Sequence, residues 1–154
     1  MIKPERLEKL NELEKKIKIN FKDKKFLRQA LVHRSYLNEN AGFDIPHNER
    51  MEFLGDAVLE LVVSSYLFSN FPNPEGDMTA WRAALVNTKM LAKISNRLDF
   101  GDYLLLSQGE AKDKGRARES ILANTMESVI GAIYLDQGYE AASGWRGGCH
   151  FSDR

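Results

Sequence analysis

Hydrophobic residues recur at α-helical spacing along much of the chain, most clearly in the stretch 47–60 and in the apolar run 57–68 that continues it. Asn48 stands at the N-cap position, where its side chain would accept a hydrogen bond from the first turn. Because 57–68 is apolar on nearly all sides, this predicted helix should lie inside the protein. One face of the helix consists of Glu49, Glu52, Asp56 and Glu60, and the opposite face of Met51, Leu54, Val58, Leu61, Val62 and Ser65.

The same spacing predicts further helices, and no β-rich stretch or repeat accompanies them, so the fold class is all-α. The tail 143–154 contains three glycines and no apolar periodicity, which predicts an irregular segment after a single domain at 1–142. The expected helices are 4–17, a second from about 21 that ends near 33–36, one at 77–98 with a bend near Asn87, and one at 121–136 with Ser120 as N-cap and Gly138 after its end.

The acidic face of the stretch 47–60 lacks the basic partners that solvated helices usually carry four residues further on. The residues at that spacing from Glu49, Glu52 and Asp56 are Phe53, Asp56 and Glu60. Stacked like charges destabilise a helix unless a cation, a raised pKa or a basic partner offsets the repulsion. An acidic helix face is usually only solvated, but the apolar surroundings favour a functional site here.

A second polar face lies in the predicted helix 121–136, where Asn124, Glu127 and Gly131 share one side. A glycine at this place permits close approach of another helix. If the partner is the helix that carries Gly55 beside Asp56, the oxygens of the two helices converge. Hard oxygen ligands that leave room for water are what Mg²⁺ prefers, so this packing would create a magnesium site.

Composition restricts the classes of function. The 154 residues include 22 basic and 22 acidic side chains, so nucleic-acid binding would need a local patch rather than a general positive charge. The single cysteine, Cys149, excludes an internal disulfide and a cysteine metal cluster. No membrane span or secretory signal is recognisable, which predicts a cytoplasmic protein without membrane contact. The local basic patch is Lys112, Lys114, Arg116 and Arg118, in a glycine-containing loop that suits phosphate contacts.

Five blocks of the sequence, in order, resemble the ribonuclease III family and together extend to about residue 142. The most specific is HNERMEFLGDAVL at 47–59. The others are ALVHRSYLNE at 30–39, EGDMTAWRAALVNTKMLA at 75–92, LLLSQGEAKDKGRARESILAN at 104–124 and MESVIGAIYLDQGY at 126–139.

The resemblance implies a homodimeric endoribonuclease that uses Mg²⁺, with Mn²⁺ as a substitute, and cuts double-stranded RNA during rRNA and mRNA processing. Its products would carry 5′-phosphate and 3′-hydroxyl ends. By the same resemblance, Glu52, Asn124 and Glu127 would bind metal, with Asp56 and Glu127 as catalytic residues. Phe53 would insert into the partner subunit. Auxiliary acids would be Glu49, Glu75 and Glu110.

Two departures from the family pattern stand in the sequence. Asn124 replaces the aspartate that most members have, which keeps one oxygen ligand but removes a charge and so predicts weaker metal attraction and reduced activity. Ser107 stands where glycine is common. No segment resembling the family's double-stranded-RNA-binding domain follows, so an RNA-binding module of low or absent activity is the alternative.

Three features of the sequence allow a second interpretation: the paired acids, His33 and Trp81. A di-iron bundle would need Glu-x-x-His pairs, but Gly55 and Ile130 stand three residues after Glu52 and Glu127, so this class is rejected. His33, beside Arg34 and Ser35, is interpreted as a local cap rather than a catalytic base. Trp81 is interpreted as a core residue rather than a base-stacking platform.

Overall fold

The structure, a computed structural model, describes residues 2–145 as an all-α fold, which confirms the predicted fold class. Besides helices, the described part contains an isolated bridge between Val32 and Leu105. No helix within it has the length and hydrophobicity needed to cross a membrane. The helices are α1 (Pro4–Ile17), α2 (Lys24–Ala30), α3 (Arg34–Glu39), α4 (Glu49–Asn70), α5 (Glu75–Val86), α6 (Thr88–Arg97), the 3₁₀ turn η1 (Phe100–Asp102), α7 (Gln108–Lys112) and α8 (Arg116–Gly144).

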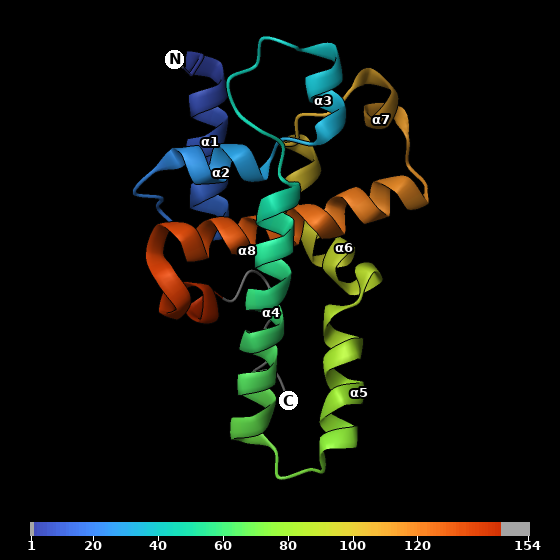
Figure 1. Ribbon diagram of the computed structural model, residues 1–154. Helices are drawn as coiled ribbons and strands as arrows, with labels where there is room; N and C mark the ends of the chain where they lie inside the picture. Colours follow the sequence, from blue (N-terminus) through green and yellow to red (C-terminus); the bar gives the residue numbers. More distant parts are fainter. Residues whose placement is uncertain (1, 146–154) are drawn as a thin grey trace.

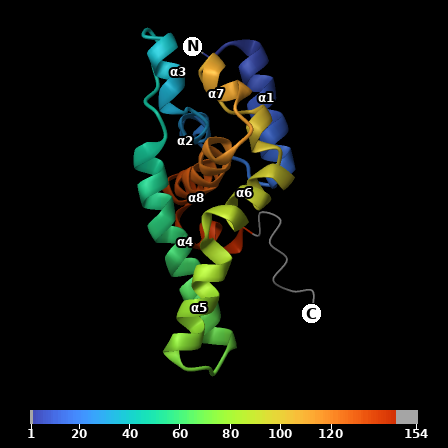
Figure 2. The same cartoon turned by 90° about the vertical axis from the view of Figure 1, so that its right-hand side faces the viewer.

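Helix α8 is the centre of the molecule, where α4 crosses it and α2 and α6 pack against it (Figure 1). Its buried face includes Leu122, Met126, Val129 and Ile133, as the helical spacing predicted. Helices α4 and α5 form a hairpin that extends away from the rest of the fold (Figure 2). The outer part of this hairpin therefore has less of the chain's own core to pack against.

Several predicted helix boundaries are wrong. The helix expected at 77–98 is divided, because Asn87 adopts an extended conformation with φ −71° and ψ 160°. The side chain of Asn87 accepts a hydrogen bond from the backbone N–H of Met90 at 2.9 Å and so caps α6. Helix α8 begins at Arg116 after Gly115, not after Ser120, so Arg116 and Arg118 belong to its first turns rather than to a loop.

Gly138 marks a kink within α8 rather than its end. Its φ of 85° and ψ of −176° interrupt the helix, which then continues to Gly144. The indole N–H of Trp145 donates a hydrogen bond to the carbonyl of Ile17 at 2.9 Å. The expected irregular tail therefore does not include residues 143–145, while residues 146–154 lie outside the described part of the chain, and the domain boundary at 142 stays a prediction.

Asn48 precedes α4 as expected, but its side chain does not cap the helix. The residue is buried, and its amide donates a hydrogen bond to the carbonyl of Ala30 at 3.0 Å. Its own carbonyl accepts a hydrogen bond from Ser128 Oγ at 3.3 Å. Asn48 thus ties the start of α4 to α2 and α8 at the same time.

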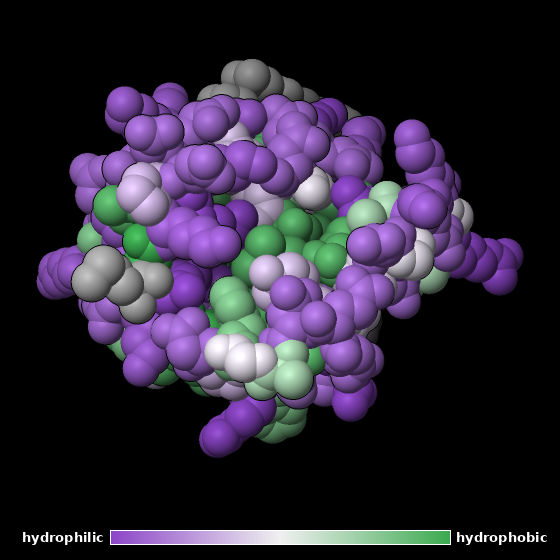
Figure 3. All heavy atoms as spheres, turned by 90° about the horizontal axis from the view of Figure 1, so that it is seen from above, coloured by the Kyte–Doolittle hydropathy of each residue, from purple (hydrophilic) through white to green (hydrophobic). Residues whose placement is uncertain are grey.

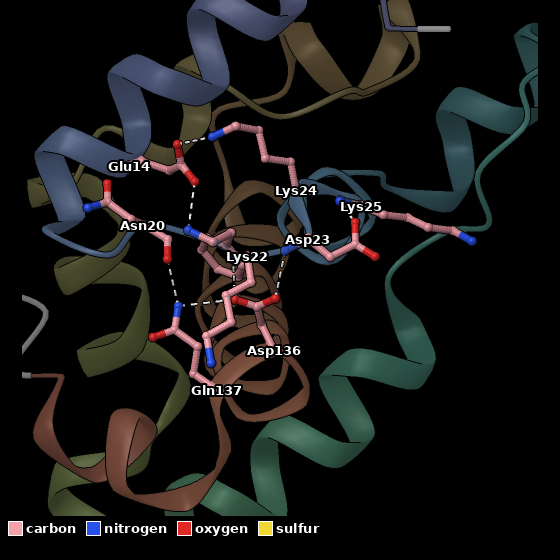
Figure 4. A network of polar contacts seen from close by, with 9 residues as sticks. Glu14, Asn20, Lys22, Asp23, Lys24, Lys25, Asp136 and Gln137 are labelled. Carbon is pink, nitrogen blue, oxygen red and sulfur yellow. Dashed lines mark hydrogen bonds and ion pairs between the residues drawn. The ribbon is translucent and has the colours of Figure 1, made fainter.

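The far end of α8 is held by the loop between α1 and α2 (Figure 4). The carboxylate of Asp136 accepts hydrogen bonds from the backbone N–H groups of Lys22 at 2.8 Å and Asp23 at 2.9 Å. Desolvation of Asp136 acts to raise its pKa, but these N–H donors outweigh it and lower the pKa. Gln137 Nε2 also donates to the carbonyl of Asn20 at 2.7 Å.

Asp136→Asn is expected to lower the free energy of unfolding by about 1–2 kcal/mol, because amides are weaker acceptors for these two N–H groups. Because its pKa is lowered, the carboxylate stabilises the fold at pH values above the ordinary pKa of aspartate. This stabilisation is lost as the pH falls. The difference between wild type and variant should therefore shrink below about pH 4. Urea denaturation at several pH values measures it, with the exposed Glu140→Gln on the same helix as control.

Candidate active site

Helices α4 and α8 touch backbone to backbone at two glycines. A Cβ added to Gly55 would lie 1.7 Å from the carbonyl oxygen of Glu127, and one added to Gly131 would lie 2.5 Å from that of Met51. Both separations are shorter than any real contact of a Cβ atom. Only glycine fits at these positions, and the predicted pairing of the two helices is confirmed.

This contact brings three carboxylates of α4 into electrostatic range of Glu127 on α8. The pKa of Glu127 is raised to about 7 by burial, and then by the charges of Asp56, Glu52 and Glu60. Burial is also the main reason that the pKa of Glu52 is raised, followed by the charges of Glu49 and Asp56. Since α4 supplies most of the charges that act on Glu127 of α8, the acids of the two helices form one site.

Neighbouring cations do not neutralise the centre of this site. Glu60 pairs with Arg82, with 3.0 Å between Oε2 and Nε, and Glu49 pairs with Arg34 at 3.2 Å. Among the described residues, Glu52, Asp56 and Glu127 form no ion pair. The three acids, called here the carboxylate cluster, therefore repel one another without relief.

The carboxylate cluster fits Mg²⁺ in its chemistry, since it offers hard oxygen ligands with uncompensated negative charge. As placed, however, no three His, Cys, Asp or Glu side chains of residues 2–145 surround a common point at metal distance. Asn124 is partly buried one turn before Glu127, and its backbone carbonyl accepts a hydrogen bond from Ser128 Oγ at 2.8 Å. Its side chain thus starts from the same face of α8 as that of Glu127.

The three auxiliary acids lie in different surroundings. Glu49 and Glu110 both act to raise the pKa of His33, although burial of that imidazole is the larger effect and lowers its pKa. Glu75 begins α5 at the outer end of the hairpin, where it accepts a hydrogen bond from Thr79 Oγ1 at 2.8 Å. Glu75 is not among the charges that raise the pKa of Glu52 or Glu127.

His33 acts as the N-cap of α3, as the sequence predicted. Its Nδ1 accepts a hydrogen bond from the backbone N–H of Ser35 at 3.2 Å and lies 2.7 Å from Ser35 Oγ. Ser107, the second departure from the family pattern, caps α7 by accepting from the N–H of Glu110 at 3.2 Å. Both residues therefore have local structural roles.

A hydrophobic surface follows the exposed side of α4 and the turn after it. Phe53 is 84% exposed and Phe68 is 79% exposed, which are unusual values for phenylalanine. Leu61 was expected on the buried face but is 54% exposed, because it lies on the other side of α4 from Val63 and Leu67, which are buried. Trp81 is not a core residue either: it is 37% exposed and packs edge-on against Phe71, with 5.3 Å between ring centroids.

The predicted basic patch lines part of a groove of about 800 Å³ between α6 and the start of α8. Lys114 and Arg118 belong to the groove lining, whereas Lys112 and Arg116 do not. The groove also contains cations of α6 that sequence reasoning missed, although their spacing of four residues places them on one helix face. These are Lys89, Lys93 and Arg97.

Comparison with known proteins agrees with the geometry. A family model described as Ribonuclease-III-like matches residues 23–147. The chain belongs to the ribonuclease III family. Ribonuclease 3 of Chloroflexus aggregans is 51% identical over 139 residues, and this match covers 88% of the chain and 61% of that protein. Ribonuclease 3 of a Geobacillus strain is 50% identical over 141 residues, covering 91% of the chain and 57% of that protein.

Two solved structures of the ribonuclease III nuclease domain from Campylobacter jejuni are similar to this fold. One has a TM-score of 0.80 at 41% identity and covers 100% of this chain and 99% of that one. The other is described as showing structural flexibility in the region involved in dimer formation. It has a TM-score of 0.76 at 47% identity and covers 85% of this chain and 88% of that one. The chain thus corresponds to a family nuclease domain and spans about 60% of the length of its full-length relatives.

Proposed function

We propose that the chain is the catalytic part of a Mg²⁺-dependent endoribonuclease that cuts double-stranded RNA and leaves 5′-phosphate and 3′-hydroxyl ends. The carboxylate cluster at the contact of α4 and α8 carries this proposal. Burial and mutual repulsion raise the pKa of Glu127 to about 7, and no cation among the described residues forms an ion pair with the cluster. Membership of the ribonuclease III family supports RNA as the substrate, and rRNA and mRNA precursors in the cytoplasm are the proposed setting.

In this proposal Glu52 and Glu127 hold the metal, and Asn124 contributes a neutral oxygen. When bound there, Mg²⁺ (or Mn²⁺ in its place) supplies an activated water and neutralises charge on the phosphate. Asp56, exposed on α4, orients water on the same side as Glu127. Because no described cation competes for these oxygens, the side chains are free to turn toward a metal ion.

The groove between α6 and α8 supports contacts to the RNA backbone. Its five cations, from Lys89 to Arg118, outnumber its two acids, Asp113 and Glu119. Lys112 and Arg116 flank the groove in sequence and would add charge near its edge. Phosphate contacts by such side chains position a duplex without reading its sequence.

The experiment that tests the proposal is incubation of the purified chain with end-labelled duplex RNA in Mg²⁺, with EDTA and the separate single strands as controls. Cuts in the duplex alone, abolished by EDTA, are the expected result. Asn124 favours a second candidate function, an RNA-binding module that does not cut. Retention of duplex RNA in a gel with no cleavage at any Mg²⁺ concentration would select that alternative.

The exposed hydrophobic side of α4 supports a homodimer. Phe53→Ala is expected to weaken dimerisation at least about tenfold, because truncation of a large buried anchor at an interface typically costs 2 kcal/mol or more. Sedimentation equilibrium measures the dissociation constant. Leu7→Ala, an exposed hydrophobic position on α1, is the matched control and should leave the constant unchanged. An unchanged dimer in Phe53→Ala would place the interface elsewhere.

A further inference from the structure

A second pocket, of about 510 Å³, lies at the end of the molecule where α1 begins, α3 ends and the loop before α4 passes. Figure 3 looks onto this end, where a mostly hydrophilic rim surrounds hydrophobic atoms. None of the residues that line the pocket belongs to α4 or α8, so it is separate from the carboxylate cluster. Its volume lies in the range of small-ligand sites.

The pocket has an excess of positive charge. Its lining includes the cations Lys3, Arg6 and Arg28, against the single acid Asp44. Asp44 Oδ1 contacts Arg28 Nη2 at 3.2 Å, but the Asp44 side chain is 60% exposed, whereas that of Arg28 is only 11% exposed. One mostly solvated carboxylate therefore faces three cations, two of which are largely buried.

The two arginines also carry buried N–H donors without acceptors. Arg6 Nη1 donates to the carbonyl of Tyr103 at 2.7 Å, but Arg6 Nε and Nη2 have no partner among the described residues. The same holds for Arg28 Nε. Buried donors of charged groups are rarely left unsatisfied in native proteins, because their desolvation is then not offset by a hydrogen bond. Burial, and then the charge of Arg28, lower the pKa of Arg6, so the two guanidinium groups also repel each other.

Aromatic rings complete the pocket. Tyr36 and Phe43 meet edge-to-face with 5.1 Å between centroids, and the Arg28 guanidinium lies 5.4 Å from the Phe43 ring centre. Phosphate oxygens suit paired guanidinium groups, since each oxygen accepts several charge-assisted hydrogen bonds. A flat base suits a wall of aromatic rings.

We propose that this pocket binds the 5′-phosphate of a nucleotide between Arg6 and Arg28, with the nucleoside against Tyr36 and Phe43. The phosphate would accept hydrogen bonds from the guanidinium groups of Arg6 and Arg28 and offset the repulsion between them. Two sources share this chemistry, a free mononucleotide and the 5′-phosphorylated end of an RNA strand. Both present a phosphomonoester, which distinguishes them from the phosphodiesters along a duplex.

The test is titration of the ¹⁵N-labelled full chain with AMP, adenosine and sodium sulfate at constant ionic strength, followed through the arginine Nε–Hε signals. We expect saturable shifts of the Arg6 and Arg28 signals with AMP, affinity at least about tenfold above that for adenosine or sulfate, and no shift of the exposed Arg50. Comparison of pApA with ApA identifies the source. Tight binding of pApA supports an RNA 5′ end, and binding of AMP alone supports a free nucleotide.

Arg6→Gln should reduce AMP affinity about tenfold or more, while Lys9→Gln, an exposed cation one turn further along α1, should leave it unchanged. Arg28→Lys provides a second variant that keeps the charge but removes the Nε donor, and it should also weaken binding. The wild-type titration does not depend on the folding of any variant. Absence of saturable shifts in wild type, or equal affinity for AMP, adenosine and sulfate, would overturn the proposal.

Discussion

Gly55→Ala is expected to destabilise the fold by about 3 kcal/mol or more, at or beyond the upper end of the usual cost of overpacking. The added Cβ would lie 1.7 Å from the carbonyl oxygen of Glu127, which is backbone and cannot rotate away. Helices α4 and α8 would have to separate along their contact. The same separation would move Glu52 and Asp56 away from Glu127, so cleavage should be lost together with stability.

Urea denaturation measures this effect, and Gly76→Ala supplies the matched control. Gly76 lies in α5 with no atom within 4 Å of the position of an added Cβ. That variant should be neutral or more stable by up to about 1 kcal/mol, because alanine is the better helix former. If Gly55→Ala is as stable as Gly76→Ala, α4 and α8 do not pack at the distance described.

Glu127→Gln is expected to reduce cleavage of duplex RNA by about 100-fold or more while the protein stays folded. Loss of groups that merely support metal ligands costs about 10- to 100-fold, and a direct ligand should cost at least as much. Glutamine keeps the size of the side chain and one oxygen, so the change isolates the charge. Single-turnover rates at saturating Mg²⁺ measure it, with circular dichroism to verify the fold.

Glu140→Gln is the matched control, since Glu140 is an exposed acid on the same helix α8. Its cleavage rate should equal that of wild type. If Glu127→Gln cuts at the wild-type rate, Glu127 is not part of the active site, and the carboxylate cluster does not have the proposed catalytic role.

The sequence predicted the helical fold and the pairing of α4 with α8, because hydrophobic spacing and the two glycines are local signals of strong physical origin. It placed a bend near Asn87 but did not predict that the helix divides there, since the same helical spacing continues through that residue while its side chain caps the next helix. The start of α8 at Arg116 was missed for a related reason. Residues 116–119 are exposed or only partly buried and so leave no hydrophobic pattern.

The exposure of Leu61 and the arginine pocket could not be predicted from the sequence pattern. Helical spacing does not tell which apolar side chains of α4 the rest of the chain covers, so Leu61 was assigned to a buried face. Arg6 and Arg28 are 22 positions apart and come from different helices. Their meeting in one pocket depends on tertiary packing, and nothing in the local sequence of either residue indicates it.

The most direct test of the carboxylate cluster as a metal site is the melting temperature of RNA-free wild type and Glu127→Gln at pH 8, in EDTA and in Mg²⁺. The raised pKa means that ionising Glu127 destabilises the metal-free fold as the pH rises through about 7. In EDTA, Glu127→Gln should therefore melt higher than wild type. With Mg²⁺, wild type should gain stability by linkage and the variant should gain much less. Equal gains in both proteins would contradict a metal site at Glu127.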